Sequence, residues 1–487
     1  MRVALTLFFS ALAMAQPGAP TAAASTASTA STEQAPPPAM PKADSTALSL
    51  EEVLASVERH YPPLRAALQD LPIAEADYLA AQGRFDLVLR SIIDSNNFGY
   101  YESRRFDLWA EQPTTLWGAT FFSGYQVSGG SFPDYDGKFQ TNGAGEYRAG
   151  MRLPLMRDRA VDGRRADLEK SRLGRRVADL GIQQQRIAIL QAATVRYWNW
   201  VFAGRRFAVA QALFDLANSR ERLLEQAVEI GQLPAFEVLD NKRIIEQRRG
   251  ALVQARRGIE QASFDLSLFY RDAQTQPVVP GDDRLPPAFP EPLNLDDARL
   301  RADIEEALSR RPEVGRLGAQ RDQVGVDRRL AENRRLPGLD FLLSYDRELG
   351  ARRVPRGPDE VRAGVAFELP LQRRTATGQE AAAQARIRQL DQRVQFQRDQ
   401  IQVDVRDAVS AVRRFFEGVQ VLRAEVDATK RVEDAERQRY QLGESTLFVL
   451  NQRELQTGDA QVREVAALAD YHRAMALYEL AIASRLR

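Results

Sequence analysis

The side chains that could do chemistry in this chain are few in kind and far apart. Histidine occurs only at His60 and His472, and none of the 487 residues is cysteine. Disulfides, thiolate metal sites, iron–sulfur clusters and cysteine nucleophiles are therefore excluded. No ligand-like spacing accompanies either histidine, so a histidine metal site or a catalytic triad has little to build on. We expect both to be ordinary helix-surface or helix-end residues.

Other catalytic signatures are missing as well. No phosphate loop, nucleophile elbow or dinucleotide fingerprint follows a strand-like segment. The charges nearly cancel, with 67 Lys and Arg against 66 Asp and Glu, and the arginines alternate with acids instead of forming a basic stripe. The sequence therefore predicts no enzyme, no cofactor, no metal and no nucleic-acid partner.

The N-terminus is typical of an exported protein. Arg2 precedes a short apolar run, and Ala13-Met14-Ala15 resembles a signal-peptidase site, which predicts a signal peptide over residues 1–15. Residues 16–47 are rich in Ala, Pro, Ser and Thr and predict a disordered linker. Because no cysteine follows the cleavage site, a lipid anchor is excluded.

The rest of the chain repeats a series of landmarks. Leu50-Glu51-Glu52 with Pro62 corresponds to Leu295-Asp296-Asp297 with Pro312, and Leu153-Pro154-Leu155 corresponds to Leu369-Pro370-Leu371. Gly231 and Gly443 each interrupt a long charged stretch. Landmarks that recur in one order predict two copies of one unit, residues 48–280 and 281–487.

Each copy is expected to contain a long helical hairpin. The apolar residues Ile401, Val405, Ala408, Val412, Phe415, Val419, Leu422 and Val426 alternate steps of four and three, which is a coiled-coil seam. Proline-free stretches at 159–230 and 373–442 could each extend about 100 Å at about 1.5 Å per residue. After each glycine a second helix would return, giving hairpins over 159–271 and 373–486.

The segments before these hairpins alternate with a period of two. Residues of about 85–155 and 339–371 place apolar and polar side chains in turn, for example at Tyr147, Ala149, Met151 and Leu153. Transmembrane barrel strands and half-buried soluble strands share this pattern. Export without a long apolar helix favours the barrel, because only helices and closed barrels cross lipid.

In their order, these landmarks resemble the TolC-like outer-membrane efflux protein family, over essentially the whole chain from Leu48. The resemblance implies an α+β membrane protein in which each repeat is a strand pair feeding an antiparallel coiled-coil hairpin. It implies a homotrimer with a 12-stranded barrel, four strands per chain, joined to a periplasmic helical tunnel. Two additional segments with a strand-like pattern, at 105–110 and 117–127, could form an external hairpin or further barrel strands.

The same resemblance implies location and partners. The protein would lie in the outer membrane of a Gram-negative-type bacterium, in contact with its lipid, and extend into the periplasm. It would be the passive exit duct of a tripartite efflux or type I secretion system, with a periplasmic adaptor and an inner-membrane transporter as partners. The transported substrate is not indicated.

The hairpin tips are the candidate functional sites. Position relative to the tip glycine makes Glu237 and Asp240 candidates for the tunnel aperture, where three copies would form a carboxylate ring that favours cations. An equal alternative is that both face solvent outside the tunnel. Candidate adaptor contacts are the tip residues Gly231, Gln232, Leu233, Gly443, Glu444 and Ser445.

Two other functions compete with the duct. A secreted or periplasmic coiled-coil scaffold would explain the helices without transport, because a heptad shows only that helices pack. A general diffusion porin is disfavoured because most of the chain is expected to be helical.

Overall fold

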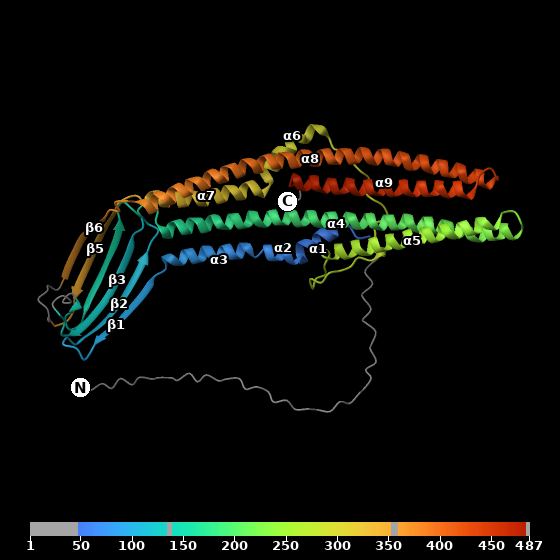
Figure 1. Ribbon diagram of the computed structural model, residues 1–487. Coiled ribbons are helices and arrows are strands. Elements are labelled where there is room, and N and C mark those ends of the chain that lie inside the picture. The colour runs from blue at the N-terminus through green and yellow to red at the C-terminus, as the bar shows by residue number, and fades with distance from the viewer. Residues whose placement is uncertain (1–46, 134–138, 352–358, 484–487) are drawn as a thin grey trace, which may run out of the picture. The chain divides into compact units, whose positions relative to one another are not determined.

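The architecture is that of a computed structural model describing residues 47–133, 139–351 and 359–483. The expected signal peptide and residues 16–46 of the expected linker lie outside the described residues. The chain from Thr46 onward forms one unit. In this unit a sheet lies at one end of a set of long helices (Figure 1).

Two antiparallel helical hairpins dominate the described chain. α4 (Gly163–Glu229) and α5 (Ala235–Ser267) form one, and α8 (Arg374–Gln441) and α9 (Leu447–Ala481) form the other. The 67 residues of α4 and the 68 of α8 correspond to about 100 Å each at about 1.5 Å per residue. A carboxylate oxygen of Asp162 accepts hydrogen bonds from the first-turn amides of α4, which fixes where that helix begins.

The shorter helices run along the two hairpins. α1 (Leu50–His60), α2 (Pro62–Ala67) and α3 (Asp70–Gln82) pack on α4. α6 (Leu300–Arg310) and α7 (Pro312–Asn333) pack on α8. Pro62 and Pro312 each stand in the first turn of a helix, where the missing amide hydrogen costs nothing.

The apolar core lies about midway along the helices. Trp200, Val53, Val201 and Leu266 are fully buried in one cluster. A second cluster joins α8 and α9 and contains most of the expected seam, Ile401, Val405, Ala408, Val412 and Val419. Phe415, also on the seam, remains 38% exposed. The heptad thus marks a packing seam shared with α6, α7 and α9.

The six described strands form one antiparallel sheet in sequential order. They are β1 (Val88–Asn96), β2 (Ser103–Pro113), β3 (Thr120–Gly130), β4 (Glu146–Pro154), β5 (Gly338–Glu348) and β6 (Asp359–Glu368). The expectation of one strand pair per half and four strands per chain is wrong, because the first half contributes four. The two additional strand-like segments form most of β2 and β3. These strands pair with each other and with β1 and β4 in the sheet, and they do not project as an external hairpin.

The strand register separates the sheet into an apolar and a polar face. Side chains alternate between faces along each strand, and paired residues share a face. The apolar face carries Leu108, Tyr125, Tyr147, Met151, Leu343, Tyr345, Val361, Val365 and Phe367. The polar face carries Arg105, Asp107, Gln126, Ser128, Glu146, Arg148, Ser344, Asp346 and Arg362.

Ion pairs connect the strands on the polar face. Arg148 of β4 pairs with Glu146 and with Asp346 of β5, and Arg362 of β6 lies 3.5 Å from Asp346. By contrast, large side chains of the apolar face are exposed even on the inner strands, 42% for Leu108 and 41% for Tyr147. The sheet therefore buries charge and exposes hydrocarbon, the reverse of a soluble sheet.

None of the helices in the described ranges combines the length and apolar character needed to cross a membrane.

Candidate functional site

The two hairpin tips lie at the end of the helices remote from the sheet (Figure 1). Gly231 has a φ of +73° and Gly443 a φ of +80°, the left-handed conformation that glycine adopts without a Cβ penalty. At the first tip, the Gly231 amide donates to Val228 O and the Gln232 amide to Ala227 O; at the second, Glu444 donates to Arg439 O. Both ends are Schellman motifs. These hydrogen bonds account for the backbone conformation of the two turns and not for any function of their side chains.

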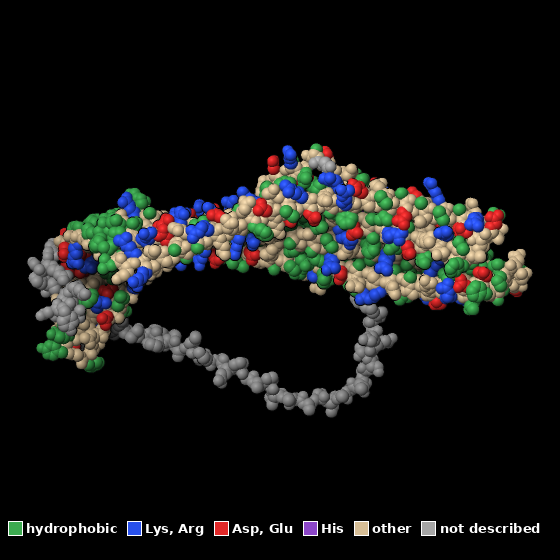
Figure 2. All heavy atoms as spheres, turned by 45° about the horizontal axis from the view of Figure 1, so that its top comes forward, with side chains coloured by type: hydrophobic (Ala, Val, Ile, Leu, Met, Phe, Trp, Pro, Cys, Tyr) green, Lys and Arg blue, Asp and Glu red, His purple; other side chains and the backbone are tan. Residues whose placement is uncertain are grey.

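Large apolar side chains surround these turns. Five of them are between 65% and 75% exposed: Ile230, Phe236, Leu239, Leu442 and Phe448. In Figure 2 hydrophobic side chains gather beside the tip of the α4–α5 hairpin. Contiguous exposed apolar residues mark interaction sites. The sequence reasoning selected the glycines and missed these five, although they flank the turns.

The two aperture candidates, Glu237 and Asp240, have different surroundings in the structure. Asp240 pairs with Arg243 one turn later on α5 at 2.9 Å, and its side chain is 16% exposed. Glu237 is half-buried near Tyr440 of α8. Burial raises the pKa of Tyr440, and the negative charge of Glu237 adds to that shift. The charge of Glu237 is therefore felt at the second hairpin, whereas Asp240 is engaged within its own helix.

The other tip candidates are mostly exposed. Gly231, Gln232, Gly443 and Glu444 are exposed, and Leu233 and Ser445 are half-buried. The Ser445 hydroxyl donates a hydrogen bond to Glu436 of α8. The backbone of the second turn is held further by Arg439, whose guanidinium donates to Glu444 O at 3.3 Å.

A buried ion network ties the two hairpins together about two turns from the tips. Glu454 of α9 is fully buried, and its carboxylate accepts from Arg220 of α4 and from Arg248 of α5. Arg220 also donates to Asn451 at 2.7 Å, and Arg248 donates to Leu213 O at 2.6 Å. A charge of this burial requires such partners. Sequence reasoning missed Glu454 because an acid on a charged helix looks like a solvated residue.

The histidine prediction holds at one position and fails at the other. His60 is the half-buried last residue of α1. His472 is only 8% exposed, so its expected place on a helix surface is wrong. Its ring stacks on Trp198 with a centroid distance of 4.4 Å, and Nε2 lies 3.0 Å from Pro290 O. Burial lowers the pKa of His472 to about 4.

Within the described residues, no group of three or more His, Asp or Glu side chains is arranged to hold a metal ion.

Solved structures of outer-membrane channels share this architecture. The open-state Neisseria gonorrhoeae MtrE outer membrane channel is similar with a TM-score of 0.63 and 16% identity, over 89% of this chain and 88% of that one. The Campylobacter jejuni CmeC outer membrane channel gives 0.61 and 13%, over 89% and 85%. The Vibrio cholerae outer membrane protein VceC gives 0.61 and 15%, over 89% and 95%.

Comparisons of sequence without structure identify no relative. No family model and no curated protein matches the chain. At identities of this size the likeness is one of fold, and it extends over nearly the whole of each channel. The chain therefore has the fold of the TolC-like outer-membrane efflux channels, which its repeated landmarks resemble.

Proposed function

We propose that this protein is an outer-membrane exit duct through which substrate leaves the cell envelope passively. The observation that carries the proposal is the sheet, whose exposed apolar face suits lipid and whose charged face suits water. The long hairpins would continue the path into the periplasm. Outer-membrane channels with the same fold support this role.

The active form would be a homotrimer. β1 and β6 are the outer strands of the sheet, and their unpaired backbone groups could not remain open in lipid. Pairing β6 of one copy with β1 of the next would remove both edges. Six strands from each of three copies would close a barrel of eighteen strands, which replaces the twelve expected from the sequence.

Engineered cysteines test this closure, and the natural chain provides a cysteine-free background. Ser91→Cys on β1, combined in turn with Val361→Cys, Ala363→Cys and Val365→Cys on β6, is expected to give oxidised trimers on denaturing gels in at least one register. A disulfide requires Cα atoms within about 7 Å. The matched control joins Ser91→Cys to Ser123→Cys on β3, which is not an edge strand.

The control pair should not link, in either the same chain or a neighbour. Absence of a product from every β1–β6 pair in the membrane-inserted protein would contradict closure through these edges. A protein that purifies from the soluble fraction without detergent would instead support a periplasmic scaffold.

The tips would be where partners act. A periplasmic adaptor would seat on the exposed apolar side chains around Gly231-Gln232-Leu233 and Gly443-Glu444-Ser445, and an inner-membrane transporter would supply the substrate. This assembly would serve efflux or type I secretion. Apolar anchors with a polar rim are typical of such interfaces.

Glu237 and Asp240 would set the charge of the tunnel aperture. Replacing both with Ala is expected to reduce the cation preference of the trimer, because a ring of carboxylates attracts cations. The reversal potential in a planar bilayer under a salt gradient measures this preference. The control is Glu246→Ala, which removes a 64% exposed acid of the same helix. Equal reversal potentials in the wild-type protein, the double variant and the control would show that Glu237 and Asp240 do not set the charge of the aperture.

A further inference from the structure

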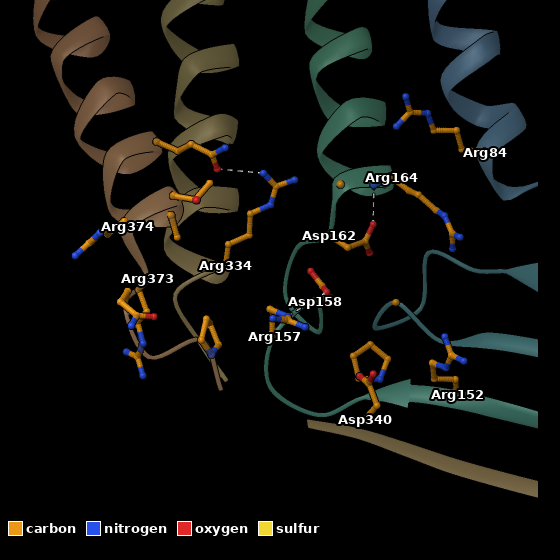
Figure 3. Close-up of a pocket in the computed structure, with 18 of the residues that line it drawn as sticks. Arg84, Arg152, Arg157, Asp158, Asp162, Arg164, Arg334, Asp340, Arg373 and Arg374 are labelled. Carbon is orange, nitrogen blue, oxygen red and sulfur yellow. Dashed lines mark hydrogen bonds and ion pairs between the residues drawn. The ribbon is translucent and has the colours of Figure 1, made fainter. Parts of the chain in front are cut away.

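An arginine-rich cavity of about 860 Å³ lies where the sheet meets the helices. It is bounded by the ends of β4 and β5 and by the first turns of α4 and α8 (Figure 3). Seven arginines and three aspartates line it, an excess of four positive charges. Its volume falls within the usual range of about 300–1,000 Å³ for small-molecule sites.

Four of these arginines have neither an ion pair nor a side-chain hydrogen bond to another described residue: Arg152, Arg164, Arg373 and Arg374. The other three are already engaged. Arg157 pairs with Glu368 at 2.7 Å, Arg84 pairs with Asp167, and Arg334 donates to Gln379 at 3.1 Å. The unneutralised charge is thus concentrated on side chains free to turn toward a ligand.

The aspartates do not cancel this charge. Asp162 is occupied by Arg165 and by the amides at the start of α4. Asp158 is half-buried and lies 3.8 Å from Arg157. Asp340 alone is left to face the four unpaired arginines.

The first turns of two long helices lie at the cavity; that of α4 is capped by Asp162, and α7 ends there with Arg334 as its C-cap, so α8 offers the free positive helix end. α4 begins at Gly163 and α8 at Arg374, and Figure 3 shows both first turns at its edge. α8 lacks a side-chain cap, since its N-cap Arg373 has a φ of +47° and accepts nothing from the first turn through its side chain. Uncapped first-turn amides and the helix dipole favour an anion.

The cavity opens on the polar side of the sheet. Arg152 pairs in register with Thr120 and Leu342, and Asp340 with Pro154 and Ala366, which places both on the face that carries Arg148 and Asp346. A charged ligand can therefore approach along the polar face, and the surrounding arginines present forked donors that fit phosphate oxygens bidentately.

We propose that this cavity is a binding site for a phosphate-type polyanion carrying at least two negative charges. Such a group could belong to a solute passing along the polar face or to a lipid headgroup at the membrane boundary. Both sources offer the same oxygens to the same arginines. The site stands on its own geometry and does not require the duct function.

Titration of the full-length protein in phosphate-free dodecyl maltoside with inorganic pyrophosphate tests the proposal. Saturable binding is expected, weakened at least tenfold in Arg373→Gln/Arg374→Gln and in Arg152→Gln. The matched control is Arg222→Gln/Arg257→Gln, which removes two exposed arginines of α4 and α5 far from the cavity. Since Arg152, Arg373 and Arg374 are exposed, these variants should fold, which far-UV circular dichroism verifies.

A second arm distinguishes the two sources. Native mass spectrometry of protein incubated with cardiolipin vesicles, whose lipid carries two phosphates, shows whether lipid occupies the site, and pyrophosphate should displace it. Binding of pyrophosphate without lipid identifies a solute site, and displaceable lipid identifies a headgroup site. Equal weakening in the control variant, or no saturable binding of either probe, would overturn the proposal. Neither result bears on barrel closure or conductance, so the two proposals fail separately.

Discussion

Replacing Glu454 with Ala is expected to lower the free energy of unfolding by about 3–5 kcal/mol. The substitution leaves Arg220 and Arg248, whose side chains are 11% and 7% exposed, without their shared carboxylate. Removing one partner of a buried pair is costly because the remaining charge stays desolvated. The urea midpoint of the detergent-solubilised protein, followed by far-UV circular dichroism, measures the loss.

Glu425 of α8 provides the control. It pairs with Arg463 of α9 across the same hairpin, but the two side chains are 39% and 51% exposed, and an exposed pair contributes about 0–1 kcal/mol. Glu425→Ala should therefore change the midpoint little. Equal losses in the two variants would show that burial of Glu454 does not matter.

A triple replacement separates the cost of an unpaired charge from the value of the network. Arg220→Met, Arg248→Met and Glu454→Leu together should recover most of the stability lost in Glu454→Ala, because no charge is then left buried. The network joins α4 and α5 to α9. Any movement that separates the two hairpins near their tips must first break it.

Acidification is expected to destabilise the protein through His472. The folded-state pKa of about 4 lies below the usual value of 6.5, so folding favours the neutral ring. The stabilisation is complete above pH 6.5 and is lost as the pH falls from 6.5 toward 4. The loss by pH 4 is about 3 kcal/mol, since each unit of pKa difference corresponds to about 1.4 kcal/mol.

The structural cause is the packing of the ring. His472 is enclosed by Trp198, Phe289 and Tyr471, and the hydrogen bond to Pro290 O only partly offsets burial. Glu51 and Glu479 line the adjoining cavity, so the charged ring has carboxylates within the same region. The stacked aromatic side chains leave it little water.

Comparison of urea midpoints between pH 7.5 and pH 4.5 isolates this effect from the titration of carboxylates. The wild-type protein and the control His60→Gln should lose more stability on acidification than His472→Gln, which cannot gain a proton in this range. Parallel pH profiles for all three proteins would rule out His472 as the source.

Local patterns were sufficient for the long helices, their turns and the alternation along the strands. The heptad of α8 predicts a buried seam because side chains three and four apart share one helix face, and Ile401, Val405 and Val412 are fully buried. Gly231 and Gly443 predict the turns because a helix ends most cheaply on a residue that accepts positive φ. Alternation at Tyr147, Ala149, Met151 and Leu153 predicts a strand for a similar reason, since successive side chains change face.

Tertiary structure decided which of these elements pair and which charges are buried. The sequences of β2 and β3 would alternate in the same way whether these strands joined the sheet or projected from it. Only their hydrogen bonds to β1 and β4 show that the sheet has six strands among the described residues. Glu454 meets Arg220 and Arg248 across more than 200 residues of sequence, and His472 meets Trp198 and Pro290 across more than 180. Whether a side chain is buried depends on the neighbours that the fold places around it. The residue pattern of a single helix does not show which neighbours those are.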